Sequence, residues 1–387
     1  MNFDFETFEL APNAARQYVD ARAVFVAHEK AVEAAKAVRG GMVWVKSKGT
    51  EYLARTTTTG AQRGLGRRDE RTEKIHSDFH ARKSKLEDRV ASLRHQLDDH
   101  VRMNRALRVG RMPPIAVRVL ARINHAGLNP FLRTVGTHAM FAYETASGVR
   151  LPSEVMTTQD IDLLYDARRQ LKFAVALESE APSMLELLRK VDKTFVIDEQ
   201  QRHTLVNDQG FQVDFLRRMQ SEDDDHPIKL GLPDKEDVYV VQARRANELM
   251  IAPGFSEVVV ASNGEMARMD TVHPAAFRDF KRWMSAQQDR DPLKRRRDRL
   301  QAEAVDQLLR ERLAHLHVGE DASAIYSPAE SLAMERTRLL REIQRTRSPS
   351  ADASPPSPEV EALDRRIAAL VGWQEHERLI QWAETFI

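Results

Sequence analysis

The chain has 387 residues, a length that indicates two or more domains rather than one core. Acidic and basic residues nearly cancel, at 58 against 59, so attraction to nucleic acid or to an anionic membrane must come from local patches. The absence of cysteine excludes disulfides, thiolate zinc sites and a cysteine nucleophile. With no basic-then-apolar leader and no apolar run near the roughly 20 residues that span a bilayer, we expect a soluble, cytoplasmic protein without membrane contact.

Residues 1–109 are predicted to form an N-terminal helical region with a short β-hairpin. Alternation over Met42–Thr56 indicates the hairpin, and the Thr-, Gly- and Arg-rich segment 56–68 is expected to be a loop. From about Thr72 to Leu107, apolar residues recur at helical spacing as a single stripe on a charged rod. This long helix is expected to pack antiparallel to another helix or to pair with a second chain, which would give a helix-mediated dimer.

Residues 110–230 are predicted to form a central core, because expected strands alternate with helices there as in an α/β layer. An amphipathic helix is expected from Ile115 to His125, and a capping box at Ser183 opens another. The expected strands are Phe131–Val135, Asp160–Leu164, Phe195–Ile197, Thr204–Val206 and Phe211–Phe215, the last two joined by a hairpin turn at 207–210.

The rest of the chain is predicted to be mixed and then helical. Residues 231–346 are expected to hold the strand Glu257–Ala261 and helices from Pro274 onward, after an acidic loop at Ser221–Asp225. Residues 347–358 are rich in Pro and Ser and are expected to be a flexible linker. Residues 359–387 are predicted to form one amphipathic helix or two.

Three carboxylates form the candidate site. Asp160 and Asp162 stand two apart on a predicted strand, so both side chains point to one face, about 7 Å apart at Cα. Asp214 lies on a later strand, and the three converge if those strands are neighbours. Like charges this close raise each other's pKa, and Mg²⁺ or Mn²⁺, which prefer oxygen ligands, would remove the conflict. The Gly136-Thr137 turn offers free N–H groups and a hydroxyl for phosphates.

These residues resemble a known superfamily. Gly136-Thr137, then Asp160-Ile161-Asp162, then Asp214 is similar to the nucleotidyltransferase superfamily of DNA polymerase β and the nucleotide-adding enzymes. Further stretches resemble one bacterial subgroup of largely uncharacterised nucleotidyltransferase-fold proteins, over about residues 40 to 312. They are Val135–Ala139, Thr158–Leu164, Asp291–Asp298, and Trp44–Arg55 with Leu65–Glu73.

The resemblance implies an α+β or α/β fold, with a mixed sheet core flanked by N-terminal and C-terminal helical regions. It implies that Gly136 and Thr137 contact a triphosphate, that Asp160 and Asp162 hold two metal ions, and that Asp214 holds the catalytic one. Two departures matter. Threonine replaces the usual serine or glycine, and the gap of 24 positions from Gly136 to Asp160 is longer than usual, so 144–158 is expected to be an inserted loop beside the site.

Several side chains keep two interpretations. The acid pair alone is more often solvated or paired with an arginine such as Arg168. Lys281 sits at the edge of a helical apolar stripe, as a snorkelling core lysine or as a contact to the β- and γ-phosphates. Lys294 opens a basic run to Arg297 that is either a solvated helix face or an electrostatic rim for nucleotide. His138 either touches the phosphates or only packs.

The leading hypothesis is a metal-dependent enzyme that transfers a nucleoside monophosphate from an NTP to a hydroxyl and releases pyrophosphate. The acceptor is left open among RNA, a protein side chain and a small molecule. Three rivals remain: a non-catalytic nucleotide- or RNA-binding module of the same fold, a toxin or defence-type nucleotidyltransferase, and a scaffold that acts through the 72–107 helix.

Overall fold

The computed structural model describes residues 5, 7–220, 227–231, 235–316, 332, 333, 335–337, 339, 340 and 358–386. The predicted acidic loop at Ser221–Asp225 and the predicted linker up to residue 357 lie outside these residues. The chain divides into two compact units. The core unit comprises residues 1–9, 118–259 and 267–387, and the hairpin unit comprises residues 10–117 and 260–266. Within the described residues, no helix is long and apolar enough to cross a membrane.

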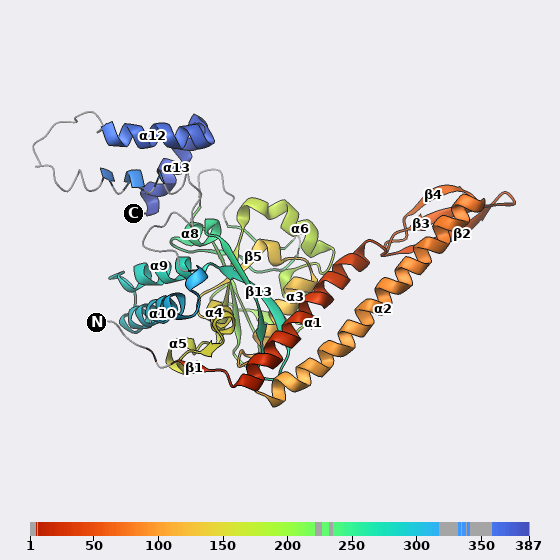
Figure 1. The fold of residues 1–387 in the computed structure, drawn as a ribbon. Helices are drawn as coiled ribbons and strands as arrows, with labels where there is room; N and C mark the ends of the chain where they lie inside the picture. Colours follow the sequence, from red (N-terminus) through yellow and green to blue (C-terminus); the bar gives the residue numbers. More distant parts are fainter. Residues whose placement is uncertain are drawn as a thin grey trace, which may run out of the picture. The chain divides into compact units, whose positions relative to one another are not determined.

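Two long helices, α1 (Pro12–Lys36) and α2 (Glu70–Ala106), form the hairpin unit and lie antiparallel to each other (Figure 1). Asp69 begins α2 with a capping box that it shares with Thr72. Near the other end of α2, the buried Gln17 side chain donates from Nε2 to Asn104 Oδ1 at 3.0 Å. The antiparallel partner predicted for the long helix is therefore α1 of the same chain, and a dimer through α2 stays a prediction.

A three-stranded antiparallel sheet joins the two long helices, in the order β2 (Gly41–Ser47), β3 (Thr50–Thr56) and β4 (Gln62–Arg67). The predicted hairpin at 42–56 is confirmed, with Lys48 and Gly49 both at positive φ in its turn. The prediction of a loop over 56–68 is wrong for residues 62–67. Two glycines weaken the strand pattern of this segment, yet it pairs along β3 with a bulge at Leu53/Ala54.

An eight-stranded mixed sheet organises the core unit. The strand order is β12-β13-β5-β7-β10-β9-β8, with β11 paired to β10. Pairing is parallel for β13–β5, β7–β10 and β10–β11, and antiparallel for β5–β7, β10–β9 and β9–β8. The strands are β5 (Leu132–Val135), β7 (Asp160–Tyr165), β8 (Val196–Ile197), β9 (Thr204–Val206), β10 (Gln212–Arg217), β11 (Val241–Gln242), β12 (Gly254–Val260) and β13 (Met266–Val272). The predicted mixed sheet is confirmed, and β12 and β13 join it from beyond the 110–230 range.

Helices pack around this sheet (Figure 1). They are α3 (Pro114–His125), α4 (Ala139–Ser147), α5 (Ser153–Met156), α6 (Gln170–Glu178), α7 (Met184–Arg189), α8 (Ala246–Ile251), α9 (Pro274–Ser285) and α10 (Pro292–Glu311). Helix α10 packs on α9 and also contacts α4 and α5. The expected inserted loop at 144–158 is wrong as a loop: it holds the end of α4, the strand β6 (Val149–Arg150) and α5. The strand β6 pairs with β1 (Phe8–Glu9).

The last described segment forms two helices, α12 (Pro358–Val371) and α13 (Trp373–Phe386). Gly372 separates them at φ +81°, a left-handed conformation that ends a helix at low cost for glycine. Leu363 and Ile367 of α12 pack in an apolar cluster with Leu332 and Ala333. Of the two predictions for this segment, one helix or two, the structure shows two.

Candidate active site

The three aspartates meet because β7 and β10 are parallel neighbours. Asp162 and Asp214 are direct register partners, and Asp160 lies two residues earlier on β7, on the same face of the sheet. One carboxylate oxygen from each residue lies within 4.8 Å of the others. The predicted convergence of Asp160, Asp162 and Asp214 is confirmed.

Neighbouring hydroxyl groups hold the two outer carboxylates. Thr158 donates its hydroxyl hydrogen to Asp160 Oδ1, and Thr204 donates to Asp214 Oδ1 at 2.5 Å. Each of these carboxylates thus keeps its second oxygen for another ligand. Thr204 faces Asp214 across the β9–β10 ladder, so the sheet register itself supplies this contact.

Asp162 has a larger rise in pKa than Asp214. Burial, followed by the charges of Asp160 and Asp214, raises its pKa to about 7, although Lys281 and Arg297 act in the opposite direction. Burial also raises the pKa of Asp214. Three partly buried carboxylates provide hard oxygen donors with too little positive charge nearby, a donor set that fits a divalent cation. Asp160, Asp162 and Asp214 could therefore hold a metal ion.

Gly136 allows the turn from β5 to α4 to approach this cluster. It has φ +65°, and a Cβ added there would lie 1.9 Å from Asp162 Oδ2, closer than any van der Waals contact. The hydroxyl of Thr137 accepts hydrogen bonds from Arg297 Nη2 and Gln301 Nε2, both at 3.0 Å. Arg297 also donates to the carbonyl of Thr157, so α10 fixes both the turn and the segment before β7.

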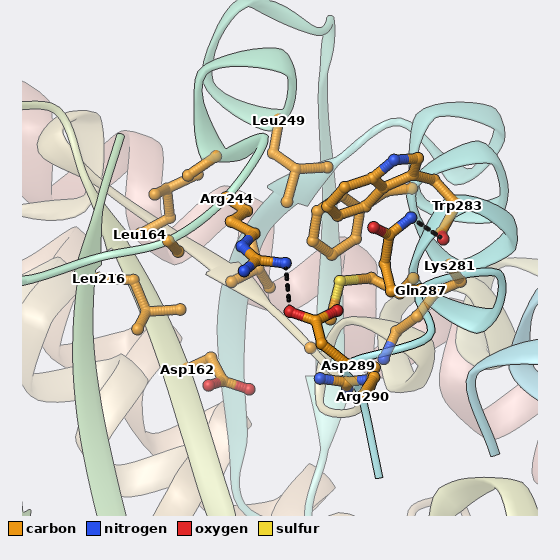
Figure 2. Close-up of a pocket in the computed structure, with 16 residues that line it drawn as sticks. Asp162, Leu164, Leu216, Arg244, Leu249, Lys281, Trp283, Gln287, Asp289 and Arg290 are labelled. Atoms are coloured by element: carbon orange, nitrogen blue, oxygen red, sulfur yellow. Dashed lines mark hydrogen bonds and ion pairs between the residues drawn. The ribbon is translucent and has the colours of Figure 1, made fainter. Parts of the chain in front are cut away.

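A cavity of about 420 Å³ opens beside Asp162 and Gly136. Figure 2 shows residues of the sheet on one side and residues of α9 and its following loop on the other. Leu164 and Leu216 line the sheet side, and Phe280, Trp283 and Met284 give α9 an apolar wall. The ion pair Arg244–Asp289, at 2.7 Å, also borders the cavity (Figure 2). A largely apolar cavity with charged groups at one end suits a ligand with a flat apolar part and an anionic part.

Two cations in the cavity wall share one buried carboxylate. Asp298 is 2% exposed and accepts from Lys281 Nζ at 2.8 Å and from Arg290 Nε at 2.5 Å. Burial lowers the pKa of Lys281, and Asp298 and Asp162 oppose that shift. The ammonium of Lys281 does not snorkel to solvent, because it forms a buried ion pair with Asp298, and its contact with phosphates stays a prediction.

Lys294 occupies a different environment from Lys281. It is exposed in the first turn of α10 and is not among the described residues that line the cavity. Arg290 and Arg297 supply the basic groups of this region instead. The spacing of Arg297 and Gln301, four apart after the helix start at Pro292, is a signal that both share a face of α10. Sequence reasoning missed Gln301, Arg290 and Asp298.

His138 lies beneath the cluster. Its side chain is fully buried, with Nδ1 placed 2.8 Å from the carbonyl oxygen of Asp160 and its ring near Phe141 and Phe211. Burial lowers the pKa of His138 to about 4, so the ring is neutral at physiological pH. Of the two interpretations given for His138, the structure supports packing, with the ring as a support for the strand that carries Asp160.

Fold and site together define a class: α+β proteins in which two neighbouring strands present acidic residues that could hold a metal ion, beside a glycine turn and a cavity with cations in its wall. A family model described as Nucleotidyltransferase matches residues 115–326 of the chain. This match covers more than half of the sequence, and the chain belongs to that nucleotidyltransferase family. No curated protein and no solved structure matches the chain. The resemblance noted over Trp44–Glu73 lies before the matched range and stays a prediction.

Proposed function

We propose that the protein is a metal-dependent nucleotidyltransferase that moves a nucleoside monophosphate from an NTP to a hydroxyl acceptor and releases pyrophosphate. The observation that carries this proposal is the convergence of Asp160, Asp162 and Asp214, of which Asp162 lines a cavity together with Gly136 and Lys281. The acceptor is a hydroxyl of RNA, of a protein side chain or of a small molecule.

The cavity suits an NTP in one orientation. The nucleoside would lie against the apolar wall that includes Trp283 and Leu216, where stacking on the indole contributes binding energy. The phosphates would lie toward Lys281 and Arg290, because two cations that share the single carboxylate of Asp298 retain net positive charge. The N–H groups of Gly136 and Thr137 in the turn would be the backbone donors for the phosphates, because those of Ala139, Met140 and Phe141 at the start of α4 already donate to the carbonyls of residues 136 to 138.

In the reaction, the acceptor oxygen forms a bond to the α-phosphorus while the bond from that phosphorus to the bridging oxygen breaks, and pyrophosphate leaves with those electrons. Asp214 would accept the hydroxyl proton; burial raises its pKa, and Thr204 donates to only one of its oxygens. Asp160, Asp162 and Asp214 would hold Mg²⁺ or Mn²⁺. When bound, the metal neutralises charge on the phosphates and lowers the pKa of the attacking hydroxyl.

The test is transfer of label from each of the four α-labelled NTPs to total cellular RNA, protein and small molecules. Asp162→Asn is expected to lower transfer by at least about 100-fold, because one ligand and one charge of the site are gone. Without metal, its melting temperature at pH 7 to 8 should equal or exceed that of the wild type. The folded pKa of Asp162 lies above its unfolded value of 3.8, so ionisation of this group destabilises the fold as pH rises through about 7.

Asp192→Asn is the matched control, because Asp192 caps a turn through Thr194 and Asn207 and lies outside the acidic cluster. It should transfer label like the wild type. Transfer that persists in Asp162→Asn would contradict the proposal. Tight binding of Mg-ATP in calorimetry without turnover on any acceptor would instead support the rival of a non-catalytic nucleotide-binding module.

A further inference from the structure

We propose that the β2–β3–β4 sheet of the hairpin unit is an RNA-binding surface, and that the RNA held there is the hydroxyl acceptor. The choice of RNA rests on the proposed function, whose acceptors are RNA, a protein side chain or a small molecule, because RNA is the polyanionic polymer among these three. The surface itself is argued from charge, exposure and side-chain placement in residues 39–68, all of which the structure describes.

Positive charge is concentrated in this short segment. Residues 39–68 contain seven basic residues and one acidic residue, whereas the whole chain has a net charge of +1. The basic residues are Arg39, Lys46, Lys48, Arg55, Arg63, Arg67 and Arg68, and the acidic residue is Glu51. The sheet is therefore a local positively charged patch on a chain that is nearly neutral as a whole. Binding to a phosphate backbone requires such a patch.

Most of this charge is available to a ligand. Arg68 is paired with Glu51 and Glu73, and Arg55 donates to backbone carbonyls and stacks on Phe79. The other five basic residues of the segment are exposed, and none of them forms an ion pair with a described residue. Because no carboxylate neutralises these five cations, phosphates could replace the counterions around them.

The two faces of the sheet have different environments. Trp44 and Leu53 are register partners on the face toward α2, where Trp44 contacts His76 and Leu53 is fully buried. Val45, Tyr52 and Arg67 are register partners on the opposite face. The guanidinium of Arg67 lies 6.0 Å from the Tyr52 ring centroid. That face therefore combines an aromatic ring on which a base can stack with a cation for the adjoining phosphate.

The edge of the sheet is open. Every residue of β4 is exposed, and a Cβ added at Gly64 would meet no atom within 4 Å. Strand β4 pairs only with β3 among the described residues, so its other edge presents backbone N–H groups that phosphates can accept from. A lipid surface fits less well, because Val43 and Leu65, both 40% exposed, are the only large apolar side chains exposed between residues 39 and 68.

The experiment measures binding of a fluorescent single-stranded RNA of mixed sequence to the full chain by anisotropy, over a range of salt concentrations. The variant carries Lys48→Gln in the β2–β3 turn and Arg63→Gln and Arg67→Gln on the open edge strand β4, three exposed positions. The control carries Arg82→Gln, Lys85→Gln and Arg89→Gln, which removes the same charge from exposed positions of α2 in the same unit.

We expect the sheet variant to bind RNA at least about 10-fold more weakly. The plot of the logarithm of its association constant against the logarithm of salt concentration should become less steep by about 2, because three phosphate contacts are lost. The α2 control should change affinity less than about 3-fold. Tyr52→Leu should weaken binding of RNA with no change in the salt slope, since it removes stacking and no charge. Equal losses in the sheet variant and the α2 control would overturn the proposal, as would unchanged binding in the sheet variant.

The source of the polyanion is tested in the same assay. Poly-glutamate that competes as well as RNA at equal charge would contradict the proposal, because the surface would then be one for acidic protein. Binding is measured with EDTA, without NTP, and in the Asp162→Asn background, so it is independent of catalysis. Loss of label transfer with intact RNA binding would count against the proposed function alone, whereas label transfer to RNA unaffected by the sheet substitutions would count against this surface alone.

Discussion

Gly136 determines how closely the β5–α4 turn approaches the acidic cluster, and it can be tested against a matched glycine. Gly136→Ala forces a Cβ into Asp162 Oδ2 and adds a left-handed backbone penalty of about 1 kcal/mol. Gly148 has nearly the same φ, +68° against +65°, but open space around it. We expect Gly148→Ala to lower unfolding free energy only by the backbone penalty, and Gly136→Ala to lower it further and to abolish transfer.

Urea unfolding and label transfer, measured on the two glycine variants in parallel, separate backbone strain from steric displacement of Asp162. Equal stability and equal activity in both variants would show that the carboxylate of Asp162 can move aside at no cost.

Glu248 provides a pH-dependent prediction away from the acidic cluster. Burial raises the pKa of Glu248 to about 8, although its partner Arg245, with Nε at 3.0 Å, lowers it. The folded protein thus keeps this proton up to about pH 8, while unfolded glutamic acid loses it near 4.5. Stability from this group is therefore present at low pH and is lost as pH rises from 4.5 through 8.

Glu248→Gln should accordingly leave the melting temperature unchanged near pH 4.5 and raise it increasingly up to about pH 8, above which the difference levels off because both folded and unfolded Glu248 have lost the proton. Glu178→Gln, which removes a carboxylate from an exposed position of α6, is measured over the same pH range as the control. A Glu248→Gln curve parallel to that of the wild type would refute the raised pKa.

At the scale of elements, Asp298 connects α10 to α9 and to the loop between them. Asp298→Asn leaves the charges of Lys281 and Arg290 without their shared anion, and we expect unfolding free energy to fall by about 3 kcal/mol. The KM for NTP should also change, because both cations line the cavity. Asp306 lies on the same helix and pairs with arginines in a more exposed cluster. Asp306→Asn should therefore lower the free energy of unfolding, measured in urea, by less than Asp298→Asn does. A cost no larger than that of Asp306→Asn would contradict the prediction for Asp298.

The sequence predicts an element well when the residues of that element alone carry the pattern, and poorly when the element depends on pairing with another segment. The long helix is predictable because its apolar stripe persists over many turns, and β7 and β10 because apolar alternation frames their aspartates. Strand β4 is not predictable from its glycines, since its pairing with β3 is what stabilises it.

The cavity wall is harder to predict than the acidic cluster. Lys281 and Asp298 lie 17 residues apart on different helices, and Asp298 ends a basic run that is typical of a solvated helix face. The partnership depends on how α9 and α10 pack, which no local pattern specifies. In the cluster, residue spacing and strand period predict that Asp160 and Asp162 share a face, whereas Asp214 joins them only through the pairing of β7 with β10, which spacing does not specify.

At the scale of the whole molecule, the two compact units should respond separately to ligands. Calorimetry is expected to show two unfolding transitions. Mg²⁺ with a non-hydrolysable NTP analogue should raise the free energy of unfolding of the core unit alone, by about 2.7 kcal/mol when the ligand concentration is 100 times Kd. Asn104→Ala removes a buried side chain bonded to Gln17 and to the carbonyl of Gly264, so it should lower the other transition.

Gln96→Ala, exposed on α2, serves as the control and should shift neither transition. A single unfolding transition that shifts both on ligand binding and in Asn104→Ala would contradict the prediction that the two units unfold separately.

The hairpin unit is discontinuous in sequence, and this has a consequence during synthesis. Residues 260–266 complete it, through the Met112–Ala261 bridge and the Asn104–Gly264 hydrogen bond. We therefore expect residues 10–117 to reach their full resistance to protease only after residue 266 has left the ribosome. Proteolysis of nascent chains stalled before and after that point would reveal the delay, and full protection of the earlier chains would exclude it.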